Sequence, residues 1–154
     1  MYTKQVIFTL DGNEYGMDVS LVSAIEKYTG VVPIPNAPAC IIGILNLRGD
    51  VIPVYSLRRK FGMQEIPGDE RTQLLVTRCN DMLIGYKVDA VAEILELEEN
   101  EVKPVPVIVK NDDTRYAGGI GSKNGRMFVM VDVKNILGEQ ESAAVREFAE
   151  KNAQ

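Results

Sequence analysis

The chain has 154 residues, of which 45% are hydrophobic and 25% charged, so it is long enough for one ordinary domain or two very small ones around a buried core. Its net charge of −5 disfavours nucleic acid as a partner, because phosphates attract basic surfaces. The absence of histidine removes the commonest general base and transition-metal ligand. The start of the chain predicts no signal peptide, and no apolar run is long enough to span a bilayer.

Short β-branched runs, separated by turn residues, follow one another along most of the chain. The predicted strands cover residues 5–10, 13–19, 31–35, 41–47, 50–57, 73–78, 82–88 and 126–133. Hairpin-type turns lie at LDGNE, LRGD, RCNDM and KNGR. Pro53 predicts an edge or a bulge in its strand. This spacing indicates small sandwiches or barrels, followed by a C-terminal helix that Ser142 can cap.

The second half of the sequence repeats the first half in the same order. Gln5, Gly16, Pro33 and Gly43 fall on Gln73, Gly85, Pro104 and Gly119, respectively. Because a unit of roughly 65 residues forms only a marginal core, we expect two units that support each other about a pseudo-twofold axis. The predicted organisation is one β-barrel repeat over 1–68, a second over 69–138 and a helix over 139–154. Two points stay open: whether the barrels exchange strands, and whether the inserted loop 107–118 is structurally ordered.

Several single residues have predicted roles in turns and caps. Gly49 and Gly125 lie where hairpin turns need positive φ, and Asp132 is placed to cap a short helix. The two cysteines, Cys40 and Cys79, have no partner motif and are expected to be reduced, buried thiols.

Arg48 lies at the tip of the hairpin between residues 41–47 and 50–57. It matches Asn124 in the second repeat, so the fold of the repeat does not require an arginine there. Two interpretations stay open: a solvated hairpin arginine, or a recognition arginine that one copy has acquired. A catalytic role is disfavoured, because no spaced pair of carboxylates or other reactive group accompanies it.

Four segments together resemble one known family: FTLDGNEYGMDVSLVSAI, IPNAPACIIGILNLRGDVIPVYSLRRKFG, GYKVDAVAEIL and GGIGSKNGRMFVMVDVKNIL. They are similar to the CheW family of bacterial chemotaxis coupling proteins, from about Gln5 to Gly138. The resemblance implies an all-β fold with short helices, made of two small five-stranded SH3-like β-barrels related by a pseudo-twofold axis, plus the C-terminal helix. It also implies a non-catalytic adaptor, without cofactor or metal, that couples membrane chemoreceptors to the histidine kinase CheA in chemoreceptor arrays.

The resemblance further implies the partners and the residues that contact them. The partners would be receptor cytoplasmic tips and the regulatory domain of the kinase, with no nucleic acid and no direct membrane insertion. The protein would be cytoplasmic and recruited to the inner face of the membrane through receptors. The expected receptor-binding residues are Val22, Asn46, Leu47, Arg48, Gly49 and Thr72. The expected kinase-binding residues are Val31, Val32, Ile34 and Val51. Neighbouring valines in a strand point to opposite faces, so one of Val31 and Val32 is expected to be exposed.

Two positions depart from the family pattern. Ala24 stands where the family usually carries an acidic residue, which leaves the partner of Arg48 open. Ser56 stands where the family often has aspartate. Because of these departures, an alternative function stays open: a CheW-like regulatory fragment that binds the kinase but not receptors. A small-molecule-binding double barrel would need a concave polar pocket, which the residue inventory disfavours.

Overall fold

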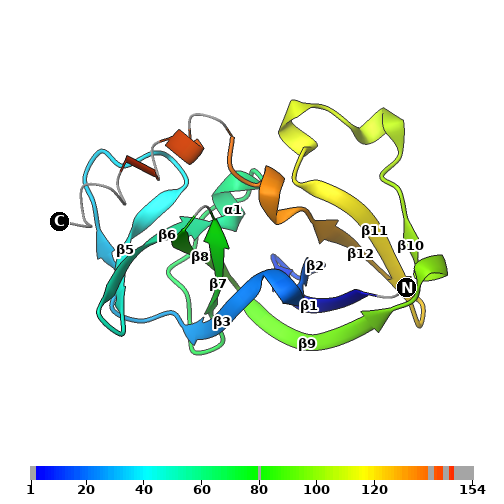
Figure 1. The fold of residues 1–154 in the computed structure, drawn as a ribbon, viewed down its shortest axis with the longest axis horizontal. Coiled ribbons are helices and arrows are strands. Elements are labelled where there is room, and N and C mark those ends of the chain that lie inside the picture. The colour runs from blue at the N-terminus through cyan, green and yellow to red at the C-terminus, as the bar shows by residue number, and fades with distance from the viewer. Residues whose placement is uncertain (1–2, 80, 139–140, 144–145, 148–154) are drawn as a thin grey trace.

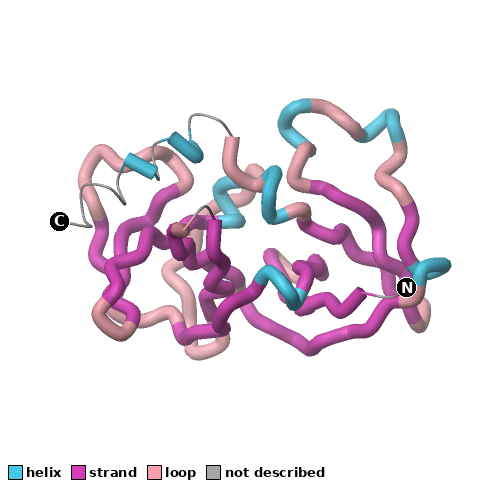
Figure 2. The backbone as a smooth tube through the Cα atoms, viewed as in Figure 1, coloured by secondary structure: helices cyan, strands magenta, loops and turns pink. Residues whose placement is uncertain are grey.

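Strands make up most of the computed structural model, which describes residues 3–79, 81–138, 141–143 and 146–147, and its helices are single turns (Figure 2). The strands are β1 Thr3–Leu10, β2 Asn13–Asp18, β3 Val22–Lys27, β4 Val32–Pro33, β5 Ile41–Leu47, β6 Asp50–Ser56, β7 Gln73–Cys79, β8 Met82–Val88, β9 Ala90–Leu97, β10 Val102–Lys103, β11 Ala117–Lys123 and β12 Arg126–Val131. The helices are α1 Leu57–Lys60 and the 3₁₀ turns η1 Val19–Leu21, η2 Glu99–Glu101, η3 Val107–Val109, η4 Asp112–Thr114 and η5 Val133–Asn135.

The strands form two six-stranded sheets that lie side by side along the longest axis of the molecule (Figure 1). Sheet A has the order β10-β11-β12-β2-β1-β9, and sheet B has the order β4-β5-β6-β8-β7-β3. The two orders correspond strand by strand, because each strand of sheet A occupies the place that its match in the other repeat occupies in sheet B. Each sheet therefore combines strands of both repeats, because β3 joins β7 and β9 joins β1.

Local irregularities repeat as well as the strand order. A register shift between Val22 and Ala24 in β3 corresponds to the shift in the β1–β9 ladder, where Phe8 pairs with Val91 and Ile7 with Glu93. Each sheet also contains one parallel pair, β6 with β8 and β12 with β2. Bulges strengthen the local twist and bend a strand, so matched bulges curve the two sheets in the same way.

Three apolar clusters lie among the residues that the structure describes. One lies inside sheet B and includes Leu45, Val54 and Leu74, and another lies inside sheet A around Ile7 and Phe128. The largest cluster takes residues from both sheets, and its largest fully buried side chains are Tyr55, Tyr86, Phe8, Leu10, Met17, Leu57, Leu75, Ile84 and Ile136. The two halves therefore share a core, as expected for repeats too small to bury enough apolar surface alone.

A buried ion pair also joins the two sheets. Arg58 of α1, which follows sheet B, donates two hydrogen bonds to Asp89, of 2.8 Å from Nε and 2.6 Å from Nη2. Asp89 also accepts a hydrogen bond of 2.8 Å from the amide of Asp11, in the β1–β2 turn of sheet A. Its own amide donates to the carbonyl of Thr9. Arg58 is 9% exposed, so this bidentate contact is largely shielded from water.

A buried lysine anchors the connection between the repeats, residues 61–72. Lys87 of β8 donates a hydrogen bond of 2.6 Å to the carbonyl of Ile66 and lies 3.7 Å from the carboxylate of Glu65. Its ammonium also lies 4.4 Å from the ring centroid of Tyr28. Burial lowers the pKa of Lys87, and the nearby Glu65 opposes that shift.

β6 is not an edge strand, since it lies between β5 and β8, but its ladder with β8 begins only at Val54, so Pro53 removes no bond from it. The β5–β6 ladder has a register shift next to Pro53, between the pairs Gly43–Val54 and Ile41–Tyr55. Most of the predicted C-terminal helix lies outside the described residues, although 141–143 and 146–147 are helical. Cys40 and Cys79 are free and half-buried.

Replacing Asp89 by alanine should lower the free energy of unfolding by about 3 kcal/mol, because it leaves the buried Arg58 guanidinium with only the exposed carboxylate of Asp11, 3.8 Å from Nη2, as an ion-pair partner. Urea denaturation measures this change. Glu96→Gln is the matched control, because the Lys4–Glu96 pair is exposed and its loss should cost less than about 1 kcal/mol. Equal losses in the two variants would contradict the importance of the buried pair.

The contribution of Asp89 should also depend on pH. Burial raises the pKa of Asp89, but hydrogen bonds from Arg58 and from the Asp11 amide outweigh it and hold that pKa below its usual value. The unfolded chain, with an aspartate pKa of about 4, therefore takes up the proton first as the pH falls. The stability difference between wild type and Asp89→Asn should be full at neutral pH and shrink as the pH falls below about 4. A difference that grows with acid would contradict this sign.

Candidate functional site

The hairpin between β5 and β6 has Arg48 and Gly49 at its tip, with φ angles of 52° and 94°. The matched hairpin between β11 and β12 has Asn124 and Gly125, with φ angles of 53° and 77°. Both turns therefore place two residues in the left-handed region, as two-residue hairpins of type I′ do, and the predictions for both glycines are confirmed. In the first hairpin the side chain of Asn46 also accepts a hydrogen bond of 2.9 Å from the amide of Gly49.

Arg48 is an unusual residue for this position. A bulky residue in the left-handed region is strained, whereas asparagine tolerates it well. The side chain of Arg48 is 76% exposed and donates one hydrogen bond of 2.9 Å, from Nη2 to Oε1 of Glu26 in β3. The side chain of Glu26 is only 23% exposed, so Glu26 is the more buried partner of this ion pair.

The other residues expected to bind receptors lie on different elements. Leu47 is half-buried against the core of sheet B, and Val22 is half-buried at the start of β3, where it pairs with Thr77. Thr72 is 4% exposed, and its hydroxyl accepts a hydrogen bond of 2.8 Å from the amide of Asp69. Thr72 precedes β7 and Thr77 lies near the end of that strand, so Val22 and Thr72 lie at opposite ends of the β3–β7 ladder.

The expected kinase-binding residues include two exposed valines. Val32 in β4 is 58% exposed and Val51 in β6 is 43% exposed, while Val31 and Ile34 are half-buried. The prediction that one of Val31 and Val32 points outward is confirmed. β4 can pack this closely on β5 because Gly43 has no Cβ, which would collide with the carbonyl oxygen of Val32.

A second exposed apolar surface was not predicted from the sequence. Val107, Ile108 and Val109, which form η3, are 82%, 95% and 47% exposed. They begin the insertion 107–118, whose next turn is held by the side chain of Asn111, which accepts hydrogen bonds from the amides of Asp113 and Thr114. The signal that could have found this surface is an apolar triplet inside an insertion that the first repeat lacks.

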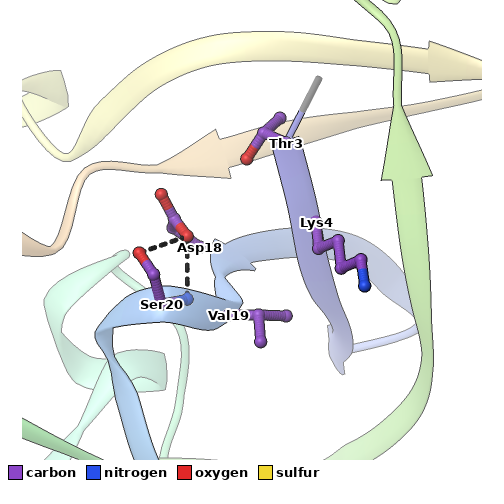
Figure 3. A pocket seen from close by; sticks show the side chains of 5 residues that line it. All are labelled: Thr3, Lys4, Asp18, Val19 and Ser20. Atoms are coloured by element: carbon purple, nitrogen blue, oxygen red, sulfur yellow. Dashed lines mark hydrogen bonds between the residues drawn. The ribbon is translucent and has the colours of Figure 1, made fainter. Parts of the chain in front are cut away.

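A hollow of about 380 Å³ lies beside the start of β1, lined by Thr3, Lys4, Asp18, Val19 and Ser20 (Figure 3). The carboxylate of Asp18 accepts hydrogen bonds of 2.9 Å and 2.8 Å from the amide and hydroxyl of Ser20, so it caps η1. Among the described residues, no three His, Cys, Asp or Glu side chains lie close enough together to hold a metal ion. Within the same residues, no helix is long and apolar enough to cross a membrane.

Comparison with known proteins identifies the family. The family model described as a CheW-like domain matches residues 4–141. The chain belongs to the CheW family. It is 35% identical to the chemotaxis protein CheW of Klebsiella aerogenes, over 96% of this chain and 89% of the relative. It is 32% identical to CheW of Helicobacter pylori, over 84% of this chain and 78% of that protein.

A solved CheW structure supports the fold. The scaffolding protein TtCheW of Thermoanaerobacter tengcongensis superposes with a TM-score of 0.79 at 32% identity, covering 86% of this chain and 90% of that one. The predicted class, all-β with two SH3-like barrels, is confirmed; the sheets count six strands because the two-residue β4 and β10 are included. The family members named here are chemotaxis and scaffolding proteins, which agrees with the prediction of a non-enzymatic adaptor.

The two departures from the CheW pattern now have structural explanations. Ala24 packs into the core of sheet B, and Glu26, two residues further along β3, supplies the carboxylate that Arg48 needs. Ser56 caps α1 by accepting a hydrogen bond of 3.1 Å from the amide of Arg59. Its match, Asp132, caps η5 through its own side chain, so the prediction for Asp132 is confirmed and serine preserves the cap in the first repeat.

Replacing Arg48 by asparagine, the residue of the matched hairpin, should change the free energy of unfolding by less than about 1 kcal/mol. Relief of the left-handed strain and loss of an exposed ion pair act in opposite directions and are of similar size. Urea denaturation checks this, with Asn124→Arg as the reciprocal control, which should be mildly destabilising. A loss above about 2 kcal/mol for Arg48→Asn would show that Arg48 is structural.

Proposed function

We propose that the chain is a non-catalytic chemotaxis adaptor that couples membrane chemoreceptors to a CheA-type histidine kinase through protein–protein contacts. Family membership supports the adaptor role, and the Arg48 hairpin carries the more specific proposal. The chain keeps a strained, exposed arginine at a position where its own second repeat has the better-suited Asn124. Strain that persists in an exposed turn points to function rather than to folding.

The receptor-facing surface is the first hairpin, with Asn46, Leu47, Arg48 and Gly49. Arg48 offers a forked set of donors suited to carboxylates and carbonyl groups of a partner. Half-buried Leu47 supplies an apolar contact beside it. Val22 and Thr72 are the remaining residues of the proposed receptor-binding set. Thr72 acts indirectly, by shaping the turn at Asp69, because its side chain is buried.

The kinase-facing surface is centred on Val32 and Val51, with the half-buried Val31 and Ile34 close to Val32 along the chain. An exposed apolar patch framed by polar residues is typical of protein contact sites. Receptor and kinase then dock on different residues of the first repeat. The exposed η3 turn in the second repeat gives a further apolar surface. The adaptor is cytoplasmic in this proposal and reaches the membrane through receptors.

Co-sedimentation with receptor-containing membranes, with and without a CheA-type kinase, tests the proposal. Wild type should sediment with the membranes and recruit kinase. Arg48→Asn should lose receptor binding by about tenfold and keep kinase binding, as expected for a recognition arginine at a contact. Arg48→Ala should behave in the same way and stay folded.

The kinase surface has a matched variant of its own. Val32→Lys introduces the residue that the second repeat has at the matched position, Lys103, and should weaken kinase binding about tenfold while receptor binding is retained. Binding of kinase but never of receptors by wild type would favour the regulatory-fragment alternative. Binding of neither partner at low salt would contradict the adaptor proposal.

A further inference from the structure

β8 contains a lysine between two fully buried residues. Lys87 is 5% exposed, and its neighbours Tyr86 and Val88 belong to the core. Lys87 matches Asp18 in the first repeat, so the fold of the repeat does not require a lysine there. Burying an ammonium is costly, and replacing a buried ion pair by apolar residues of similar volume is often neutral or stabilising. A directed contact therefore explains this lysine better than a need for stability does.

The ammonium of Lys87 joins two segments of the chain to sheet B. It donates a hydrogen bond of 2.6 Å to the carbonyl oxygen of Ile66 and lies 3.7 Å from Oε1 of Glu65, and both residues belong to the connection 61–72. On the other segment, the ring centroid of Tyr28 lies 4.4 Å from Nζ. This cation–π contact reaches the chain directly after β3, which ends at Lys27.

Tyr28 is also fixed by contacts of its own. Its amide donates a hydrogen bond of 3.3 Å to the carbonyl oxygen of Thr72, and its ring packs against the apolar cluster inside sheet B. The connection can approach the ring because Gly68 has no Cβ, which would lie 3.2 Å from Cδ2 of Tyr28. The chain therefore leaves β3 from a position that the ammonium, the connection and the sheet define together.

Tyr28 begins the segment that carries the proposed kinase-facing residues. Val31 follows three residues later and packs against the same cluster of sheet B as Tyr28. Between them Gly30 has a φ angle of 67°, in the left-handed region that favours glycine. Val32, the next residue, is 58% exposed. Contacts at Tyr28 and Val31 thus set the direction in which Val32 faces water.

We propose that Lys87 is a positioning residue for the kinase-facing surface: its ammonium holds the ring of Tyr28, and Tyr28 holds the segment 28–32 in the conformation that presents Val32 to the kinase. This role rests on the proposed kinase contact of Val32. A segment ordered before binding loses less conformational entropy when the partner docks. The ammonium gives the ring a preferred orientation, which an apolar neighbour of the same volume would not impose.

The test measures binding to a CheA-type kinase, with receptor co-sedimentation as the readout of any general change in fold. The variant is Lys87→Met together with Glu65→Gln, so that no carboxylate loses its cation. Its kinase binding should be about three- to tenfold weaker than that of wild type, with receptor binding unchanged. Glu65→Gln alone is the control and should bind both partners as wild type does, because the ammonium keeps Ile66 and Tyr28.

The aromatic partner has matched variants of its own. Tyr28→Phe keeps a ring face for the ammonium and should bind the kinase as well as wild type does. Tyr28→Leu removes that face and should weaken kinase binding as much as the Lys87→Met/Glu65→Gln variant does. Adding Tyr28→Leu to that variant should cause no further loss, because the substitutions remove the same contact.

The outcomes separate this role from the proposed function. Wild type that never binds the kinase, or Val32→Lys that binds it as well as wild type, overturns the proposed kinase surface and the positioning role with it. Wild type that binds, with the Lys87→Met/Glu65→Gln variant binding equally well, overturns only the positioning role. Parallel loss of kinase and receptor binding in that variant shows a purely structural role and overturns it as well. Equal losses in Tyr28→Phe and Tyr28→Leu, or losses that add in the combined variant, also overturn it.

Discussion

Exchange of the hairpins β1–β2 and β7–β8 between the repeats is the constraint on which the structure depends, because each hairpin lies in the sheet that the other repeat supplies with its four remaining strands. β3 leaves the sheet of β1 and β2 to pair with β7, and β9 makes the reciprocal crossing to β1. Neither repeat can then complete a sheet or bury its apolar face without the other, and the largest apolar cluster forms between them. The buried pair of Arg58 and Asp89 locks the same junction with directional bonds.

A rigid double barrel with internal symmetry can still present an asymmetric surface. The symmetry fixes the backbone, so both hairpins have the same left-handed turn. The side chains differ: the first hairpin has the exposed Arg48, and the second has Arg126 held by two carboxylates. Similarly, β4 has the exposed Val32 where β10 has Lys103. In the proposed function, the partners bind at substituted positions of a scaffold that the duplication supplies twice.

Local features of the fold could be predicted from the sequence because they depend on neighbouring residues. Turn residues and β-branched runs predicted most strands, and Gly49, Gly125 and Asp132 were assigned correctly. The strand exchange could not be derived, because repeat matching shows which strands correspond but not which ones pair. Glu26 was missed as the partner of Arg48 for a similar reason: the two residues meet across a curved sheet, far apart in its strand order.

Kinase control is the most direct test of the adaptor account, because binding alone does not show coupling. The measurement is autophosphorylation of a CheA-type kinase in receptor-containing membranes, with and without the chain, in the presence and absence of a receptor stimulus. The account predicts that the stimulus changes kinase activity only when the chain is present, and that Arg48→Asn abolishes this control. A stimulus that changes kinase activity equally in the absence of the chain would contradict the account. Kinase activity that does not respond to the stimulus, although the chain, the receptors and the kinase sediment together, would contradict it as well.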